Sequence, residues 1–333
     1  MTAFEFGGRA IAAGARETVN LEVSTLANAA PMTLPVHVVH GVEAGPVMFL
    51  SGVVHGDEIQ GLEIVRRVLG HDALKSLRGT LLAVPIVNGF GFLNHSRYMP
   101  DRRDLNRSFP GSDQGSLASL LADLFFREIV KRSDYGIDLH TAALHRTNLP
   151  QVRIAPDDTE LVTLAQAFGA PVILTSKLRE GSLRQSAKQA GVKVLLYEGG
   201  EALRFDEAAI EAGVKGCLRV MKHLGMVSEA PKVAQHAGPV TSSSSTWVRA
   251  PEGGILHSVR RVGDKVGLKE PIAVITDPLG SVTVPVFAED DGIIIGRTNL
   301  PIVNRGDALF HVARIKPTAR GQVQATPDED EII

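Results

Sequence analysis

From residue 36 to residue 224, short apolar runs alternate with longer stretches in which apolar positions recur at helical spacing. Such an alternation predicts strands separated by amphipathic helices. The predicted strands are Val36–Val39, Val47–Val53, Thr80–Val87, Tyr135–His140, Val152–Ala155, Val172–Leu174 and Val192–Tyr197, and the predicted helices are Glu58–Leu69, Ser116–Arg132, Leu161–Phe168 and Asp206–Leu224. We therefore expect an α/β domain with a mixed, mostly parallel sheet flanked by helices.

The pattern changes after residue 240, and this change predicts a second, smaller domain. Residues Val240–Thr246 are rich in serine and indicate a linker or an exposed loop. Beyond them, short strand patterns separated by Gly-Asp turns predict a small C-terminal all-β unit. We expect an α/β domain over residues 1–240, a β-domain over residues 247–316 and a flexible tail over residues 317–333.

The expected β-domain resembles the biotinyl/lipoyl-type sandwich of carrier proteins. In those domains a lysine in a central hairpin carries the prosthetic group. The matching turn here, Thr276–Ser281, contains no lysine. A carrier role is therefore not favoured, because a fold alone is no evidence of function.

Composition limits the classes of function. The hydrophobic fraction of 44% and the charged fraction of 22% are those of an ordinary globular chain, and the net charge of -2 argues against general binding to nucleic acid or to acidic membranes. The only cysteine, Cys217, excludes an intrachain disulfide and is compatible with a reducing compartment. No signal-like segment or long apolar run occurs, so we expect a soluble, cytoplasmic protein. Its oligomeric state stays open, with a homo-oligomer as one alternative.

Two side chains that can bind a metal follow one of the apolar runs. His55 and Glu58 come directly after the strand predicted from Val47 to Val53, and His140 ends another predicted strand. Sites in α/β domains gather at the carboxyl ends of strands. Zinc in hydrolytic sites commonly takes three protein ligands, often two His and one Glu, and keeps a fourth position for water. The pattern makes His55, Glu58 and His140 the candidate ligands of one zinc ion per chain, with a chance His-x-x-Glu match on a solvated turn as the alternative at this point.

The segment from residue 88 to residue 111 is crowded with arginines among turn residues. They are Arg97, Arg102, Arg103 and Arg107. A guanidinium group offers a planar fork for a carboxylate, so arginines beside a metal suit an anionic substrate. For Arg102 and Arg103 we prefer the alternative of a solvated basic loop.

Taken together, the motifs identify the chain as a member of a known family. His55-Gly-Asp-Glu58, Asp104-Leu-Asn-Arg107, Asp138-Leu-His140 and a strand that ends in Glu198 occur in the order found in the succinylglutamate desuccinylase/aspartoacylase family. This family is a branch of the zinc carboxypeptidase-like superfamily. The resemblance covers roughly residues 36–225, and the β-domain is similar to the C-terminal domain of many members.

The resemblance implies a role for each matching residue. His55, Glu58 and His140 would bind zinc, Glu198 would serve as general base and then acid, Asn106 and Arg107 would hold the substrate carboxylate, and Asp104 would orient His55. Arg97 would polarise the scissile carbonyl. More residues separate it from Asp104 than in the shortest version of the motif, so Arg102 and Arg103 stay open as alternatives.

Three neighbouring carboxylates have other readings. Glu201 competes with Glu198 as the base, but Glu198 is preferred because it directly ends the strand, whereas Glu201 lies beyond two glycines. Asp57 is expected to cap the following helix. Asp138 precedes His140 by two residues on a strand, so we expect it to make a structural hydrogen bond on the same side.

The function implied by the resemblance is that of a zinc-dependent amidohydrolase. It would cleave the amide bond of a small N-acylated amino acid or a related amide that bears a carboxylate. A zinc carboxypeptidase acting on short peptides is the first alternative, and a site narrowed by the β-domain would argue against it. A non-catalytic zinc-binding or ligand-binding protein is the second, disfavoured because Glu198 is present along with every ligand.

Overall fold

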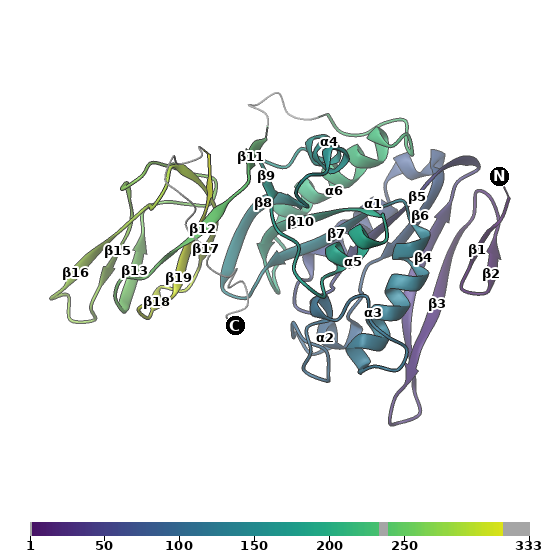
Figure 1. The fold of residues 1–333 in the computed structure, drawn as a ribbon, viewed down its shortest axis with the longest axis horizontal. Coiled ribbons are helices and arrows are strands. Elements are labelled where there is room, and N and C mark those ends of the chain that lie inside the picture. The colour runs from purple at the N-terminus through teal and green to yellow at the C-terminus, as the bar shows by residue number, and fades with distance from the viewer. Residues whose placement is uncertain (1, 233–238, 316–333) are drawn as a thin grey trace.

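The structure is a computed structural model that describes residues 2–232 and 239–315 (Figure 1). Its α-helices are α1 (Gln60–Leu69), α2 (Gly89–Leu93), α3 (Leu117–Glu128), α4 (Thr159–Phe168), α5 (Leu183–Gln189) and α6 (Glu207–His223). The strands of the first part are β1 (Phe4–Phe6), β2 (Arg9–Ile11), β3 (Arg16–Thr25), β4 (Pro31–His40), β5 (Glu43–Gly52), β6 (Arg78–Val84), β7 (Tyr135–Ala142), β8 (Arg146–Ile154), β9 (Val172–Thr175) and β10 (Lys193–Glu201). Those of the second part are β11 (Val240–Ser242), β12 (Ser245–Arg249), β13 (Gly254–Ser258), β14 (Lys265–Val266), β15 (Pro271–Thr276), β16 (Thr283–Phe287), β17 (Gly292–Thr298), β18 (Ile302–Val303) and β19 (Ala308–Arg314). Among the described residues, no helix is both long and apolar enough to cross a membrane.

The main sheet is mixed, as predicted, with a parallel centre. Strands β10, β7, β5 and β6 run parallel in that spatial order, and β8 and β4 add antiparallel neighbours on either side. Parallel strands present their carboxyl ends at one edge of a sheet, which is where α/β proteins build their sites. The residues that follow β5, β7 and β10 therefore meet at one edge.

Helices cover both faces of this sheet, and each face has its own core. Along β5, Met48 and Leu50 pack into the core beneath α1, α4 and α6, whereas Phe49 between them packs into the core beneath α3. The alternation follows from the strand period of two, which sends successive side chains to opposite faces. Burial on both faces explains why these strands read as continuous apolar runs.

All the predicted strands and helices are present, with ends that differ by a few residues, but the N-terminal strands and the short helices α2 and α5 were missed. Strand β3 alternates polar residues with the buried Val19 and Leu21. It is the last strand on its side of the sheet, beyond β4, and only one of its faces packs on the core. Such strands lack the continuous apolar run that marked the central ones.

The C-terminal part is a β-sandwich, as predicted. Strands β16, β15, β13 and β18 form one sheet, and the facing layer contains β12, β19, β17 and β14. Their shared core includes Leu256, Ile272, Ile294 and Phe310. The facing layer is also continuous with the main sheet through the antiparallel pair of β17 and β8, so the large sheet has 13 strands.

The expectation of a linker or exposed loop over Val240–Thr246 was wrong. Val240–Ser242 forms β11, which pairs with β9, and β12 begins at Ser245. The buried Ser242 Oγ lies 2.8 and 2.7 Å from the carbonyl oxygens of Ser244 and Arg314, so its single O–H can donate to either of them. Backbone pairing has outweighed the turn tendency of the serines. The division into domains stays a prediction, and the tail expected over 317–333 lies outside the described residues.

Candidate functional site

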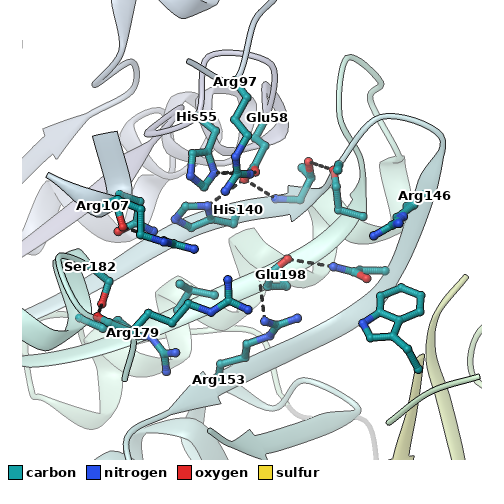
Figure 2. A pocket seen from close by; sticks show the side chains of 18 residues that line it. His55, Glu58, Arg97, Arg107, His140, Arg146, Arg153, Arg179, Ser182 and Glu198 are labelled. Atoms are coloured by element: carbon teal, nitrogen blue, oxygen red, sulfur yellow. Dashed lines mark hydrogen bonds and ion pairs between the residues drawn. The ribbon is translucent and has the colours of Figure 1, made fainter. Parts of the chain in front are cut away.

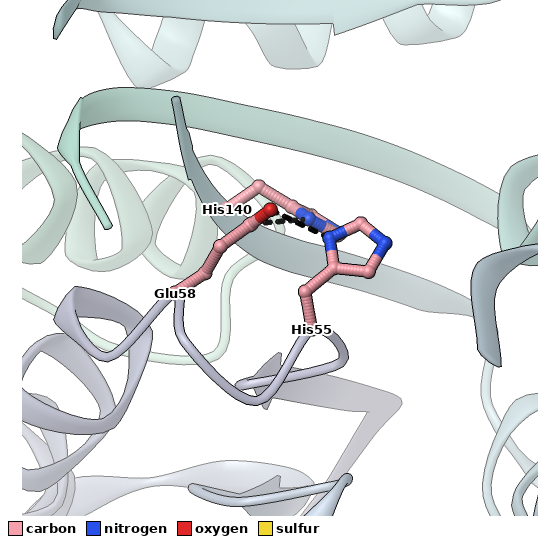
Figure 3. Close-up of side chains that lie close together, drawn as sticks. All are labelled: His55, Glu58 and His140. Atoms are coloured by element: carbon pink, nitrogen blue, oxygen red, sulfur yellow. Dashed lines mark hydrogen bonds and ion pairs between the residues drawn. The ribbon is translucent and has the colours of Figure 1, made fainter. Parts of the chain in front are cut away.

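The three predicted metal ligands meet at the carboxyl edge of the central strands (Figure 3). His55 and Glu58 lie in the turn between β5 and α1, and His140 lies near the end of the neighbouring parallel strand β7. One ligand atom from each residue lies within 4.8 Å of the other two. The side chains belong to residues only 4%, 2% and 4% exposed, respectively. Residues 85 positions apart in sequence thus form one compact donor set.

Glu58 stands between the two imidazoles, and two further carboxylates hold them from behind. Glu58 Oε1 lies 2.6 Å from His55 Nδ1, and Oε2 lies 2.8 Å from His140 Nδ1. On the far side of each ring, His55 Nε2–H donates to Asp104 Oδ1 at 3.2 Å, and His140 Nε2–H donates to Asp138 Oδ2 at 2.8 Å. Carboxylates at these positions orient the rings and direct Nδ1 of each toward the shared point.

The imidazoles and carboxylates of this cluster shift one another's pKa values. Burial alone lowers the pKa of His140, but the carboxylates of Asp138 and Glu58 more than offset this effect and raise the pKa well above its ordinary value. Burial and Arg97 lower the pKa of His55, but Glu58 and Asp104 have the larger, opposite effect, so the pKa is raised overall. Burial raises the pKa of Glu58, yet the two histidines bring it far below its usual range. The cluster concentrates negative charge behind two imidazoles, an arrangement suited to a divalent cation.

The structure contradicts the expectation that Asp57 caps α1. The residue before the helix is Ile59, and no side chain makes a capping hydrogen bond there. Asp57 Oδ1 is buried and has no hydrogen-bond partner among the described residues. Burial and then the neighbouring Glu58 raise the pKa of Asp57 to about 6. The close packing of the metal-site turn has prevented the local capping geometry that the sequence favoured.

Glu198 lies beside the cluster, on β10. The parallel register of β10 and β7 pairs Glu198 with His140, so both side chains leave the same face of the sheet. The Asn148 amide donates to Glu198 Oε2 at 2.8 Å, and Arg153 Nη1 lies 3.7 Å from Oε1. Glu201 lies instead near the β7–β8 turn, where its Oε1 accepts from the backbone N–H of His145 at 3.0 Å. Of the two glutamates, only Glu198 lines the cavity described below.

The arginines of the residue 88–111 segment separate into two groups. Arg97 lies against the cluster: Nη1 donates to Glu58 Oε1 at 3.2 Å, and Nε and Nη2 donate to Asp104 Oδ2 at 3.2 and 3.0 Å. Arg102 and Arg103 are exposed and do not line the cavity. Their positions agree with the solvated loop preferred for them.

Asn106 and Arg107 line the cavity on the side of α5. Asn106 Oδ1 accepts from the backbone N–H of Leu183 at 2.9 Å, which ties this turn to the first turn of α5. Arg107 Nη1 donates to the carbonyl oxygen of Asn106 at 2.7 Å. The Asn106 oxygen is therefore engaged within the protein, and its amide N–H groups are the part of the side chain that can donate to another partner.

The cavity itself is small and strongly cationic (Figure 2). It has a volume of about 100 Å³. Six arginines line it, against two glutamates, Glu58 and Glu198. Residues not singled out from the sequence are Arg146, Asn148, Arg153, Arg179, Arg184 and Trp247. Such an excess of positive charge attracts small anions.

Arg184, on α5, is a buried cationic side chain in the wall of this cavity. Its Nη1 is buried without a hydrogen-bond partner among the described residues, while Nη2 donates to Ser176 Oγ at 3.2 Å. Burial and then the nearby Arg153 guanidinium lower the pKa of Arg184 to about 10. An anion in the cavity would relieve both penalties. No helix was predicted around Arg184, so no signal in the sequence pattern marked this residue.

A mixed sheet that carries a His–Glu–His donor set and a neighbouring glutamate beside a small cationic cavity is typical of metal-assisted amide hydrolases. The model of the succinylglutamate desuccinylase/aspartoacylase catalytic domain matches residues 44–224. The chain belongs to this family, as its motifs predicted. It is an amide-hydrolysing deacylase, an enzyme acting on carbon–nitrogen bonds.

Individual relatives agree with this assignment. The chain is 30% identical over 297 residues to the N-alpha-acetyl-L-2,4-diaminobutyric acid deacetylase of Halomonas elongata, covering 85% of this chain and 86% of the relative. It is similar to the crystal structure of a succinylglutamate desuccinylase/aspartoacylase from Rhodobacter sphaeroides, with a TM-score of 0.81 and 25% identity over 90% of this chain and 96% of that one. The product-bound ectoine utilization protein EutE (DoeB) from Ruegeria pomeroyi shares the fold, with a TM-score of 0.79 and 23% identity over 90% of this chain and 94% of that one.

Proposed function

We propose that this protein is a zinc-dependent deacylase that hydrolyses the amide bond of a small N-acylated amino acid or a related amide bearing a carboxylate. The observation that carries the proposal is the convergence of His55, Glu58 and His140 next to Glu198 in a cavity lined by six arginines. The donor set matches the ligands zinc commonly takes in hydrolytic sites.

His55 Nδ1, His140 Nδ1 and the Glu58 carboxylate would hold the ion, with Asp104 and Asp138 orienting the imidazoles. A bound zinc ion would lower the pKa of water to about 7 and polarise the amide carbonyl. Arg97 Nη1 lies 3.2 Å from both His55 Nδ1 and Glu58 Oε1, so binding of a cation requires these two contacts to open. The two contacts of Arg97 with Asp104 involve no proposed ligand atom and can persist.

Glu198 is the proposed general base and acid. Its carboxylate takes the proton of the attacking water and then delivers it to the leaving amine nitrogen. The Asn148 amide fixes Oε2, and Arg153 lies near Oε1, so the carboxylate is held in one orientation next to His140. Arg97, anchored by Asp104, is placed to stabilise negative charge on the former carbonyl oxygen.

Substrate selection rests on size and charge. Asn106 and Arg107 would bind the substrate carboxylate, which Arg184 and its neighbours favour electrostatically. A cavity of about 100 Å³ is below the usual range for ligand pockets and suits a small amide better than a peptide. The Halomonas elongata relative, a deacetylase by name, supports a deacylase over the carboxypeptidase alternative.

The test is a screen of N-formyl, N-acetyl and N-succinyl amino acids with metal-stripped protein and added zinc. Hydrolysis that depends on zinc supports the proposal. Glu198→Gln should retain zinc but lose turnover by roughly 100-fold or more, because the base is removed while the ligands remain. Glu201→Gln is the matched control and should keep most of the activity. Near-normal turnover by Glu198→Gln, or zinc-independent hydrolysis, contradicts the proposal.

A further inference from the structure

One wall of the cavity comes from the C-terminal sandwich. Trp247, on β12, lines the cavity together with Arg146 from β8. The Arg146 guanidinium carbon lies 5.0 Å from the centroid of the indole ring, and the His311 ring is stacked on the indole with centroids 4.6 Å apart and an interplanar angle of 9°. Two ring contacts of this kind restrict the indole to one orientation.

The sandwich is also tied to the rim of the cavity by side chains. The Asn299 side-chain amide donates to Thr147 Oγ1 at 2.7 Å and to Glu201 Oε2 at 2.9 Å, and the backbone N–H of Asn299 donates to the carbonyl oxygen of His145 at 2.7 Å. The β17–β8 ladder, with Gly296 opposite Asn148, continues this attachment. The wall that carries Trp247 is therefore held against the site by a network of hydrogen bonds.

Arg107 and Arg146 mark opposite ends of the cavity, with the His–Glu–His cluster and Glu198 between them (Figure 2). A substrate whose amide lies at the cluster and whose carboxylate lies at Arg107 must direct its acyl group toward Arg146. The acyl group would then contact the indole of Trp247, which packs against the Arg146 guanidinium group.

We propose that Trp247 is the residue that limits the length of the acyl group, so that the C-terminal sandwich takes part in substrate selection. This inference rests on the proposed deacylase function. A short acyl chain lies against the face of the indole, whereas a longer one must displace a ring held by both Arg146 and His311. A steric wall is selective only when it resists displacement; the stacked His311 ring supports the indole, and the hydrogen bonds of Asn299 tie the sandwich to the rim of the cavity.

The test varies the acyl chain and the wall together. The N-acetyl, N-butyryl and N-hexanoyl derivatives of the amino acid that gives the best turnover are compared with wild type, Trp247→Phe and Trp247→Ala. The hexanoyl-to-acetyl ratio of kcat/KM should rise by at least about 10- to 100-fold in Trp247→Ala and by less in Trp247→Phe, because the misfit of even one methylene against a pocket wall is worth about this much discrimination. Phe287→Ala, which truncates an exposed aromatic residue of β16 elsewhere in the sandwich, should leave the ratio unchanged.

A second readout uses the fact that Trp247 is the only tryptophan in the chain. In the Glu198→Gln variant with zinc, the N-acetyl derivative should change the intrinsic fluorescence in a saturable way. An unchanged acyl-length profile in both Trp247 variants, or a fluorescence that does not respond to a derivative the enzyme hydrolyses, overturns the inference. A Trp247→Ala profile that changes with the amino acid instead of the acyl group also overturns it. Absence of hydrolysis of every N-acyl amino acid by the wild type would refute the proposed function itself.

Discussion

Replacement of Asp138 tests whether the carboxylates behind the imidazoles tune the metal site. Asp138 is fully buried on β7; its Oδ2 accepts from His140 Nε2–H at 2.8 Å, and its Oδ1 accepts from the Ser51 hydroxyl at 2.7 Å. Asparagine has the same shape and can keep its oxygen toward His140, while its NH₂ group donates to a reoriented Ser51 hydroxyl. Asp138→Asn therefore removes the charge and preserves the hydrogen-bond pattern.

The expected change in zinc affinity follows from the two hydrogen bonds of Asp138. Loss of an outer partner of a metal-binding histidine typically costs 10- to 100-fold in metal affinity, or about 1.4–2.7 kcal/mol. Asp138→Asn should fall near the lower limit, because the imidazole keeps its acceptor. Asp138→Ala should reach the upper limit, since His140 Nε2–H would be left buried without a partner, and unfolding free energy should fall by about 1–3 kcal/mol.

The measurement is a zinc titration of metal-stripped protein against a competing chelator, with a denaturant melt to confirm folding. Ser51→Ala is the matched control, because it removes the other hydrogen bond of Asp138 and leaves its charge and its contact with His140 in place. Its zinc affinity should stay within about threefold of the wild type. Wild-type zinc affinity in Asp138→Asn and Asp138→Ala, or an equal loss in Ser51→Ala, would refute the reasoning.

Three further predictions concern charge and packing. Arg107→Ala should lower kcat/KM about 30- to 1000-fold for a carboxylate substrate and less for the corresponding amide; equal losses in steady-state kinetics would mean that no carboxylate is bound there. Asp158→Asn should lower stability by up to about 1 kcal/mol at pH 7, because it loses the 2.7 Å ion pair with Lys193. Burial raises the pKa of Asp158, but Lys193 and the backbone N–H of Leu161 lower it overall below 3.8, so the difference should fade in melts as pH falls below about 4 and the wild-type carboxylate is protonated. Gly216→Ala should destabilise the fold by about 1–3 kcal/mol in denaturant melts, since the new Cβ would lie 2.3 Å from the Phe168 ring; an unchanged midpoint would contradict this.

The convergence of His55, Glu58, His140 and Glu198 could be predicted because its signal is local. His55 and Glu58 follow a strand that is buried on both faces, and His140 and Glu198 lie near the carboxyl ends of β7 and β10. Parallel strands bring their carboxyl ends to one edge whatever the details of packing, so position along the chain was enough to place these side chains together. The family motifs then added the roles proposed for them.

Local reasoning failed where a longer-range contact decided the outcome. Asp57 is a residue type that often caps helices, yet the turn between His55 and Glu58 leaves it buried and without a capping hydrogen bond. The serine-rich segment after Val240 has a composition typical of a loop, yet its first residues form β11 because they pair with β9. In both cases the surroundings, absent from the local sequence, outweighed a preference of about 1 kcal/mol.

The amino-acid sequence by itself determined the fold class, the motifs and the family, since strand periodicity and motif order are properties of neighbouring residues. Only the tertiary structure decided what surrounds the proposed substrate. Arg153 and Arg184 become cavity residues through the register of β8 and the packing of α5, and Trp247 reaches the same cavity because β17 pairs with β8. Strand register and the attachment of one sheet to another depend on residues far apart in the chain, so no local pattern could place the wall that Trp247 forms.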